Sequence, residues 1–253
     1  MLADIEQVKR IVVEAGKAAL ARRGTEVTEF KADESIVTAV DRDTERYIED
    51  SLKALYPNYS FYGEEYGFRG DHESPLWVCD PIDGTTNYVC GIPQWCVSVG
   101  LLHNGESVMG AIYLPVFDDL YWAVKGEGAF LNDKPIHNTD RDSLHIEDTI
   151  IFTSNAAKLL NIEKIGCRIR SFGSIAIELC YAAQGVVTAA LGLKEGIVDV
   201  GAALCICKEA GCEFRYLEGP LVDINELLTA GRTERPFIYG PPRLVAHLQS
   251  VLS

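Results

Sequence analysis

The residues best suited to chemistry are two aspartates, Asp80 and Asp83, in the octapeptide Asp-Pro-Ile-Asp-Gly-Thr-Thr-Asn at residues 80–87. The apolar run before them, residues 76–79, predicts a short buried strand, and the residues after Gly84 predict the start of a helix. Carboxylates supply the oxygen ligands that hard divalent cations take, and free N–H groups at a helix start attract phosphate. The octapeptide therefore places a candidate cation site beside a candidate anion site, which is what metal-assisted phosphate chemistry needs.

Further acidic residues occupy similar places, each where an apolar segment ends. Glu64 and Glu65 follow a short strand-like segment rich in aromatic residues, and Asp41 follows the apolar run 36–40. Asp199 follows a Gly-Ile-Val segment and opens a helix of small residues. If the fold gathers these segment ends, the carboxylates form one cluster, which would repel strongly without cations.

Each of these acids also has a structural interpretation that needs no ligand. Asp83 alone would suit a turn and Asp80 a helix N-cap. Asp41 would be a favourable acid in the first turn of a helix, and Asp199 a cap. For Glu65, a surface position and a contact to metal through water are both open. The complete octapeptide together with Glu64 favours the functional interpretation.

The elements that must position these acids follow both helical and strand-like patterns. Helical spacing predicts helices at residues 5–24, 44–55 (capped by Thr44), 174–184 (capped by Ser174), 200–210 and 241–252. Strands are predicted at residues 36–40, 59–62, 76–79, 95–103, 107–114, 120–124, 128–131, 151–152, 186–191, 213–217 and 237–239. Asn104-Gly105 predicts a tight hairpin. The order indicates a mixed α and β protein with layers of each, without strict βαβ alternation.

Bulk properties exclude several classes of function. The 253 residues could form one large domain or two small ones. No apolar run approaches the ~18 residues of a membrane span, and charged residues near the N-terminus argue against a signal peptide. The net charge of −14 disfavours nucleic acid and anionic membrane surfaces as partners. We expect a cytoplasmic protein that binds neither nucleic acid nor membrane.

The eight cysteines predict buried, reduced thiols and no metal site. Most of them lie among apolar neighbours, and none forms a Cys-x-x-Cys pair of the zinc type. Cys205 and Cys207 are two positions apart in a helical pattern, so their side chains point to different faces. Buried reduced thiols are typical of a cytosolic protein.

The Gly-Glu-Glu at residues 63–65 followed by the octapeptide resembles the signature of the inositol monophosphatase family, which are Mg²⁺-dependent, lithium-sensitive phosphatases. Residues 198–203 resemble a second family signature, with Val198 in place of the usual tryptophan. The resemblance covers nearly the whole chain. It implies an α/β fold of the inositol monophosphatase and fructose-1,6-bisphosphatase type, with alternating helix and sheet layers in an αβαβα sandwich, and it suggests a homodimer.

The domain organisation expected with this fold is a single domain over residues 1–253. The segment 133–148 is polar and is expected to connect two halves of the fold. The domain would then comprise an N-terminal subdomain, residues 1–140, and a C-terminal subdomain, residues 141–253.

The resemblance implies a metal-binding role for five residues and a cofactor of two or three Mg²⁺ ions. Glu64, Asp80 and the carbonyl of Ile82 would hold one ion. Asp80, Asp83 and Asp199 would hold a second, and Glu64 with solvent a weaker third. Metal so placed would activate a water and neutralise charge on the phosphoryl oxygens.

The resemblance also implies catalytic and substrate-binding roles. The Thr85 hydroxyl, oriented by Asp41, would act with Glu64 to activate the metal-bound water. The N–H groups of Gly84 and Thr85 would hold the phosphate. The expected substrate-binding set is Asp83, Gly84, Thr85, Ser174 and Asp199. Lys31 lies where the family often keeps a lysine, but a solvated surface lysine is the simpler interpretation.

The substrate is less clearly indicated than the chemistry. Aligned with animal members, the glutamate that contacts inositol falls at Gly192 and a small residue beside the ring becomes Ile175, changes that would loosen or redirect recognition. Glu195 could take over if its loop is rearranged. Residues 170–180 also resemble archaeal and bacterial members, some of which accept fructose 1,6-bisphosphate.

The sequence therefore predicts Mg²⁺-dependent hydrolysis of a small phosphorylated metabolite by metal-activated water. Inositol monophosphate is the first candidate substrate, with fructose 1,6-bisphosphate and histidinol phosphate as alternatives. A non-catalytic metabolite-binding or regulatory protein is the alternative of another class.

Overall fold

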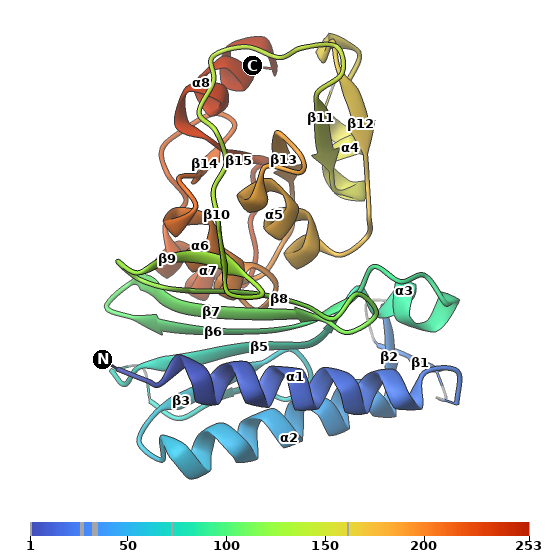
Figure 1. The fold of residues 1–253 in the computed structure, drawn as a ribbon, viewed down its shortest axis with the longest axis vertical. Coiled ribbons are helices and arrows are strands. Elements are labelled where there is room, and N and C mark those ends of the chain that lie inside the picture. Colours follow the sequence, from blue (N-terminus) through green and yellow to red (C-terminus); the bar gives the residue numbers. More distant parts are fainter. Residues whose placement is uncertain (1, 26–27, 32–34, 72, 161, 253) are drawn as a thin grey trace.

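The computed structural model describes residues 2–25, 28–31, 35–71, 73–160 and 162–252, and these form five stacked layers (Figure 1). The helices are α1 (Ile5–Arg22), α2 (Ala39–Leu55), α3 (Thr85–Cys90), α4 (Ser154–Leu159), α5 (Ile175–Gln184), α6 (Ile197–Glu209), α7 (Ile224–Ala230) and α8 (Pro242–Leu252), with a 3₁₀ turn at Ile162–Lys164. α1 and α2 cover one face of a large sheet, α5 and α6 lie between this sheet and a second one, and α4 and α8 cover the far face. This is the predicted αβαβα order.

The large sheet has eight strands and is mostly antiparallel. Its order is β10 (Lys134–Ile136), β9 (Gly128–Leu131), β8 (Asp119–Val124), β7 (Glu106–Leu114), β6 (Cys96–His103), β5 (Leu76–Asp83), β3 (Ser60–Gly63) and β4 (Gly67–Arg69). Asn104 and Gly105 join β6 to β7 with φ values of 52° and 74°, as the predicted type I′ turn requires. β3 runs parallel to β5, so these two strands end at the same edge.

The second sheet has five strands and lies beyond α5 and α6. Its order is β12 (Arg168–Arg170), β11 (Thr149–Phe152), β13 (Ala189–Gly192), β15 (Phe237–Gly240) and β14 (Glu213–Tyr216). A separate pair of short strands, β1 (Thr28–Phe30) and β2 (Ile36–Thr38), precedes α2.

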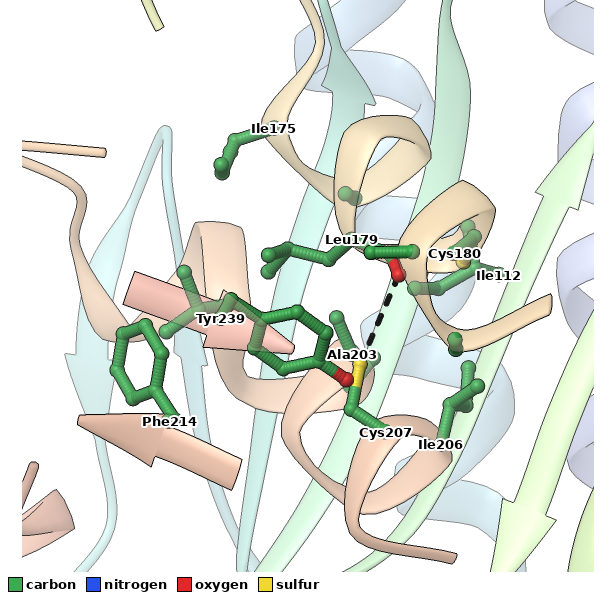
Figure 2. Close-up of a cluster of buried hydrophobic side chains, with 14 of the residues drawn as sticks. Ile112, Ile175, Leu179, Cys180, Ala203, Ile206, Cys207, Phe214 and Tyr239 are labelled. Carbon is green, nitrogen blue, oxygen red and sulfur yellow. Dashed lines mark hydrogen bonds between the residues drawn. The ribbon is translucent and has the colours of Figure 1, made fainter. Parts of the chain in front are cut away.

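The central apolar cluster holds the two sheets together through α5 and α6 (Figure 2). Ile112 from the large sheet, Leu179 from α5, Ile206 from α6 and Tyr239 from the second sheet all belong to it. α6 lies directly on the large sheet, because a Cβ added at Gly110 would be 2.1 Å from the Ala202 carbonyl oxygen. The cluster contains residues from both sides of residue 140, and the subdomain boundary stays a prediction.

Several predicted element boundaries are wrong, and the site residues lie at most of them. α2 begins at Ala39 and not at Thr44, because Thr38 and Asp41 form a capping box. β5 continues to Asp83 through a register shift and does not end at residue 79. α6 begins at Ile197, three residues earlier than predicted. Both Asp41 and Asp199 therefore lie in the first turn of a helix.

Other elements were not predicted at all. They are the short strands β1, β4, β10 and β12, the 3₁₀ turn and the short helices α4 and α7. β10 lies inside the segment expected to be only a polar connection, and β13 starts at Ala189, later than expected. Segments this short have too few residues to show a periodic pattern.

The cysteines are unpaired, as predicted, and six are buried. Cys90 is exposed and Cys167 partly so, which the sequence did not indicate. Cys207 donates a weak hydrogen bond from its thiol to the Leu179 carbonyl, 3.8 Å away (Figure 2). In the described parts of the chain, no helix has both the length and the apolar character needed to cross a bilayer.

Candidate active site

The predicted site residues meet where β3 and β5 end and α2, α3 and α6 begin. β3 and β5 are parallel neighbours, and the Glu64 N–H donates to the Cys79 carbonyl at 3.1 Å, so Glu64 lies beside the end of β5. Asp80 and Asp83 occupy that end of β5. Asp41 and Asp199 come from the first turns of α2 and α6. Four segments that are distant in the sequence thus converge, as predicted.

The pKa values of the aspartates indicate that these acids lie close enough together to repel one another. Burial raises the pKa of Asp80 well above its usual range, and the charges of Glu64, Asp83 and Asp199 raise it further. Burial likewise raises the pKa of Asp83 to about 6. It also raises the pKa of Asp199 to about 7, with Asp83 as the next cause. No Lys, Arg or His of the described chain forms an ion pair with any of these three aspartates.

Asp83 is anchored to the start of α5. Its Oδ2 accepts hydrogen bonds from the Ser174 hydroxyl at 2.5 Å and from the Ala176 N–H at 2.7 Å. Ser174 lies at the N-cap of α5, as predicted, but its side chain does not cap the helix. The carboxylate of Asp83, which belongs to β5, caps the helix instead. Asp83 therefore has both a structural role and a candidate metal-binding role.

Thr85 and Asp41 form the predicted pair. The Thr85 hydroxyl lies 3.1 Å from Asp41 Oδ1 and 3.0 Å from the Ile82 carbonyl oxygen, both acceptors. The other oxygen of Asp41 accepts from the Thr38 N–H at 2.9 Å and the Thr38 hydroxyl at 2.6 Å. Asp41 therefore caps α2 with one oxygen and faces Thr85 with the other. It has both of the positions considered for it, an acid in the first turn of a helix and a partner of the Thr85 hydroxyl.

Gly84 lies between the aspartates and α3 in the left-handed region, with φ 89°. A Cβ there would be 3.1 Å from the Gln94 carbonyl oxygen and 3.1 Å from the Ser174 Cβ. Both the positive φ value and the small space left for a Cβ atom therefore favour glycine at position 84. The first N–H groups of α3 have no intrahelical acceptor and are available to an anion.

The positions of Lys31 and Glu65 correct the simplest predictions for them. The Lys31 ammonium lies 2.8 Å from Glu64 Oε1 and 2.6 Å from Glu65 Oε1, and its side chain is only 25% exposed. Glu65 is 5% exposed and is not a surface residue. Lys31, which directly follows β1, thus brings a cation to the Gly-Glu-Glu segment, a contact that no local pattern indicates.

Two buried glutamates that the sequence analysis missed support the site. Glu45, on α2, accepts hydrogen bonds from the N–H groups of Glu65 at 2.7 Å and Tyr66 at 3.0 Å, which fixes the turn that carries Glu64. Burial raises its pKa to about 7. Its spacing of four residues from Asp41 places both on one helix face and could have indicated it.

Glu178, on α5, has the corresponding role on the other side of the site. Its Oε1 accepts from the N–H groups of Phe172 at 2.6 Å and Gly173 at 3.1 Å, and so holds the loop that ends at Ser174. Asn87 donates to the Phe172 carbonyl at 2.7 Å and joins this loop to α3. Burial raises the pKa of Glu178 to about 7.

The three positions considered for substrate recognition, Gly192, Ile175 and Glu195, have different surroundings in the structure. Gly192 is buried in β13 against Phe237, whose Cζ would be 2.2 Å from an added Cβ, so position 192 cannot present a substrate contact here. Ile175 and Glu195 instead line a cavity of about 210 Å³ that also borders Asp83 and Asp199. Glu195 therefore lies in the cavity beside the aspartates, and Gly192 does not line it.

The donor chemistry of the cluster fits a hard divalent cation. The side chains are oxygen donors only, they are crowded, and three lack a cationic partner among the described residues. Local bonds set their present orientations: Glu64 faces Lys31, Asp80 accepts from the Ile82 N–H, and Asp199 accepts from the Gly196 N–H. In these orientations, no three His, Cys, Asp or Glu side chains of the described chain form a coordination set.

The raised carboxyl pKa values predict that, without divalent cations, the free energy of unfolding falls as the pH rises from about 4 toward 7. Unfolded carboxyls release their protons near pH 4, whereas the folded protein holds them to higher pH, so rising pH favours unfolding. Urea unfolding in EDTA at roughly pH 5, 6 and 8 measures this loss. Added Mg²⁺ should recover stability most at the highest pH; equal recovery by NaCl at matched ionic strength would contradict the prediction.

Comparison with known proteins gives a consistent result. The model of the inositol monophosphatase family matches residues 2–251. A protein named fructose-1,6-bisphosphatase/inositol-1-monophosphatase from Aquifex aeolicus is 34% identical over 220 residues, 83% of each chain. A protein named Nus factor SuhB from Xylella fastidiosa is 35% identical over 198 residues, 73% of this chain and 71% of the relative.

Solved structures of the same kind match almost the whole chain. An inositol monophosphatase of Thermotoga maritima has a TM-score of 0.87 at 27% identity, covering 98% of this chain and 95% of the other. The structure of SaIMPase-II bound to inositol monophosphate has a TM-score of 0.80 at 25% identity, covering 97% and 92%.

Proposed function

The chain belongs to the inositol monophosphatase family, a family of phosphatases, and we propose that it hydrolyses a small phosphate monoester with Mg²⁺ as its cofactor. The observation that carries this proposal is the meeting of Glu64, Asp80, Asp83 and Asp199 beside the start of α3. An oxygen-rich cluster without cationic partners for its aspartates suits divalent cations, and the adjacent helix start suits a phosphate group.

The metal ligands would be the carboxylates of Glu64, Asp80, Asp83 and Asp199 and the Ile82 carbonyl, in sites for two or three Mg²⁺ ions. When bound, such ions lower the pKa of water and neutralise negative charge on phosphoryl and leaving-group oxygens. The raised pKa values of the aspartates support this assignment, because a bound cation would offset both the burial of the charged carboxylates, which is the main cause of the shifts, and their mutual repulsion.

The protein's own contribution to proton transfer would come from Thr85 and Asp41. The Thr85 hydroxyl lies 3.1 Å from Asp41 Oδ1, so when Oγ1 accepts a proton from an attacking water, its own proton would pass to the Asp41 carboxylate. Asp41 cannot turn away easily, because its other oxygen is held by Thr38. Glu64 would be the second proton acceptor at this side of the phosphate.

Phosphate would be oriented by the N–H groups of Gly84 and Thr85. The left-handed conformation of Gly84 turns the chain from β5 into α3, so these groups lie directly after Asp83 at the helix start. The leaving group would then extend past Asp83, Ser174 and Asp199 into the cavity beside α5.

Inositol monophosphate is the substrate best supported by the comparisons, with fructose 1,6-bisphosphate and histidinol phosphate as alternatives. The test is phosphate release by the purified protein from each of these compounds and from 3′-phosphoadenosine 5′-phosphate. We expect turnover of at least one ester with Mg²⁺ and none in EDTA. Release that persists unchanged in EDTA would disprove the metal-dependent mechanism.

The relative named Nus factor SuhB favours a second candidate of another class, a regulatory or metabolite-binding protein. Such a role would not require turnover, whereas the complete set of site residues in this chain suits catalysis. If calorimetry shows Mg²⁺ binding to the folded protein but no ester is hydrolysed, the second candidate replaces the first.

Three further properties are proposed. A homodimer and inhibition by lithium are proposed from the family resemblance, and a cytoplasmic location from the composition and the charged residues near the N-terminus. Sedimentation equilibrium would measure the oligomeric state, and phosphate release in LiCl against NaCl would measure the inhibition.

A further inference from the structure

Strand β6 lies directly beside the end of β5 that carries two of the proposed metal ligands. In the antiparallel register Ser98 is paired with Asp80 and, beyond a register shift, Cys96 is paired with Asp83. Side chains two residues apart in a strand point to the same face of the sheet. Cys96 belongs to the central apolar cluster, so this face is the one covered by α5 and α6. Cys96 and Ser98 therefore form a row of two polar side chains opposite the two aspartates.

The thiol of Cys96 contacts Asp83 directly. Cys96 is fully buried, and its Sγ lies 3.8 Å from Asp83 Oδ2 and 3.8 Å from Ser174 Oγ. The Ser174 hydroxyl and the Ala176 N–H, which also donate to Oδ2, come from the start of α5, whereas Cys96 comes from the large sheet. All of these donors bond Oδ2, which favours Oδ1 as the oxygen that ligates a cation.

Ser98 gives a second, independent observation, a buried hydroxyl without a partner. Ser98 is fully buried, and its Oγ has no hydrogen-bond partner among the residues that the structure describes. The buried hydroxyl of Ser107, on β7, by contrast donates to the Gly201 carbonyl at 2.7 Å. Because a buried hydroxyl without a partner is costly, we expect Ser98 to gain one in another state of the site.

Asp80 is the acceptor that the register places opposite this hydroxyl. The carboxylate of Asp80 is turned toward its own chain, where Oδ1 accepts from the Ile82 N–H at 2.9 Å. Directly opposite residues of an antiparallel pair have Cβ atoms roughly 5 Å apart, so rotation of the Asp80 side chain can bring its carboxylate within reach of Ser98. A cation that drew Asp80 away from Ile82 would then leave the carboxylate a new donor.

We propose that Cys96 and Ser98 are positioning residues for the metal ligands: Cys96 holds Asp83, and Ser98 donates to Asp80, in the orientations that bind a cation. A hydrogen bond to a ligating carboxylate fixes its orientation and strengthens metal binding. A thiol is a weak donor, so Cys96 orients Asp83 and leaves most of its negative charge to the cation. This inference rests on the proposed Mg²⁺ cofactor.

The test measures Mg²⁺ binding by calorimetry, which does not depend on turnover, after dialysis against EDTA. The variants are Cys96→Ala, Cys96→Ser and Ser98→Ala. Cys207→Ala is the matched control for Cys96, because Cys207 is also buried in the central cluster and its thiol donates to a backbone carbonyl and not to a carboxylate (Figure 2). Ser107→Ala is the control for Ser98.

Cys96→Ala and Ser98→Ala are each expected to raise the Kd for Mg²⁺ about tenfold, the lower end of the cost of losing a hydrogen bond to a metal ligand. Cys96→Ser keeps a donor and should raise it less than about threefold. Both controls should bind Mg²⁺ like the wild type. The Mg²⁺ concentration that gives half-maximal phosphate release should rise in parallel, while kcat at saturating Mg²⁺ falls less than about threefold.

Melting temperatures in EDTA separate positioning from a purely structural role. Ser98→Ala removes a buried hydroxyl that has no partner, so without metal this variant should melt no lower than the wild type. Ser107→Ala breaks a hydrogen bond and should melt about 2–4 °C lower. A purely structural Ser98 would show the opposite result, a lower melting temperature with unchanged Mg²⁺ affinity.

The inference is overturned if either Cys96→Ala or Ser98→Ala binds Mg²⁺ as tightly as its control. It is also overturned if Cys96→Ser loses as much affinity as Cys96→Ala, since packing and not the donor would then explain the loss. Wild-type protein that binds no Mg²⁺ would reject the proposed cofactor and this inference together. Binding of Mg²⁺ by the wild type without hydrolysis of any ester would instead reject only the phosphatase function.

Discussion

Asp83→Asn is expected to reduce kcat by roughly two to four orders of magnitude while the protein stays folded. The substitution removes the negative charge that Asp83 would contribute to a metal ion. The structural bonds of this side chain should survive, because an amide oxygen can still accept from Ser174 and from the Ala176 N–H. Phosphate release with saturating substrate and Mg²⁺ measures the effect.

The control for this prediction is Asp50→Asn, at an exposed position on α2. It changes the net charge equally and should leave kcat unchanged. Calorimetric titration with Mg²⁺ should show weaker binding for Asp83→Asn only. Near-normal turnover by Asp83→Asn, with an unchanged melting temperature, would show that Asp83 is not a metal ligand and has only its structural role at the start of α5.

Thr85→Ala is expected to lower kcat by about two to four orders of magnitude, with a much smaller effect on Mg²⁺ binding. The substitution removes the hydroxyl that lies 3.1 Å from Asp41 Oδ1 and is proposed to accept the proton of the attacking water. The backbone N–H of residue 85, which would hold the phosphate, is retained. Separate measurement of kcat and KM distinguishes these roles.

Two matched variants sharpen the test of Thr85. Thr85→Ser keeps the hydroxyl and should retain most of the activity. Thr86→Ala removes the neighbouring hydroxyl, which is exposed, and should be close to wild type. If Thr85→Ala raises KM and leaves kcat unchanged, Thr85 binds phosphate and takes no part in proton transfer.

The short helices and the exact element boundaries show where sequence patterns stop being informative. Apolar periodicity predicted α1, the β6–β7 hairpin and α8 nearly to the residue. It placed the start of α2 at Thr44, because a threonine before an apolar stripe is a common cap, whereas the capping box at Thr38 supplies two bonds. Several elements of three to seven residues, such as α7, were missed.

The sequence by itself was enough to predict the chemistry proposed for the site, because most of the residues proposed to perform it are contiguous. The octapeptide contains two of the carboxylates, the Ile82 carbonyl, the left-handed glycine and Thr85, all within residues 80–85. Their mutual geometry follows from one strand, one turn and one helix start. The pattern of an acid at the end of an apolar segment added Asp41, Glu64 and Asp199, and the fold does bring these residues to this place.

Only the tertiary structure decided how these residues are held and what lies beside them. Asp83 caps α5 through the N–H of a residue 93 positions away in the sequence. Lys31, directly after β1, forms an ion pair with Glu64. The ring of Phe237 fills the space beside Gly192. The turn at Lys194 directs Glu195 into the cavity. Such contacts depend on how the layers pack, which local backbone preferences and apolar periodicity do not encode. The proposed chemistry depends on residues close together in the sequence, whereas the shape of the substrate cavity depends on the assembled layers.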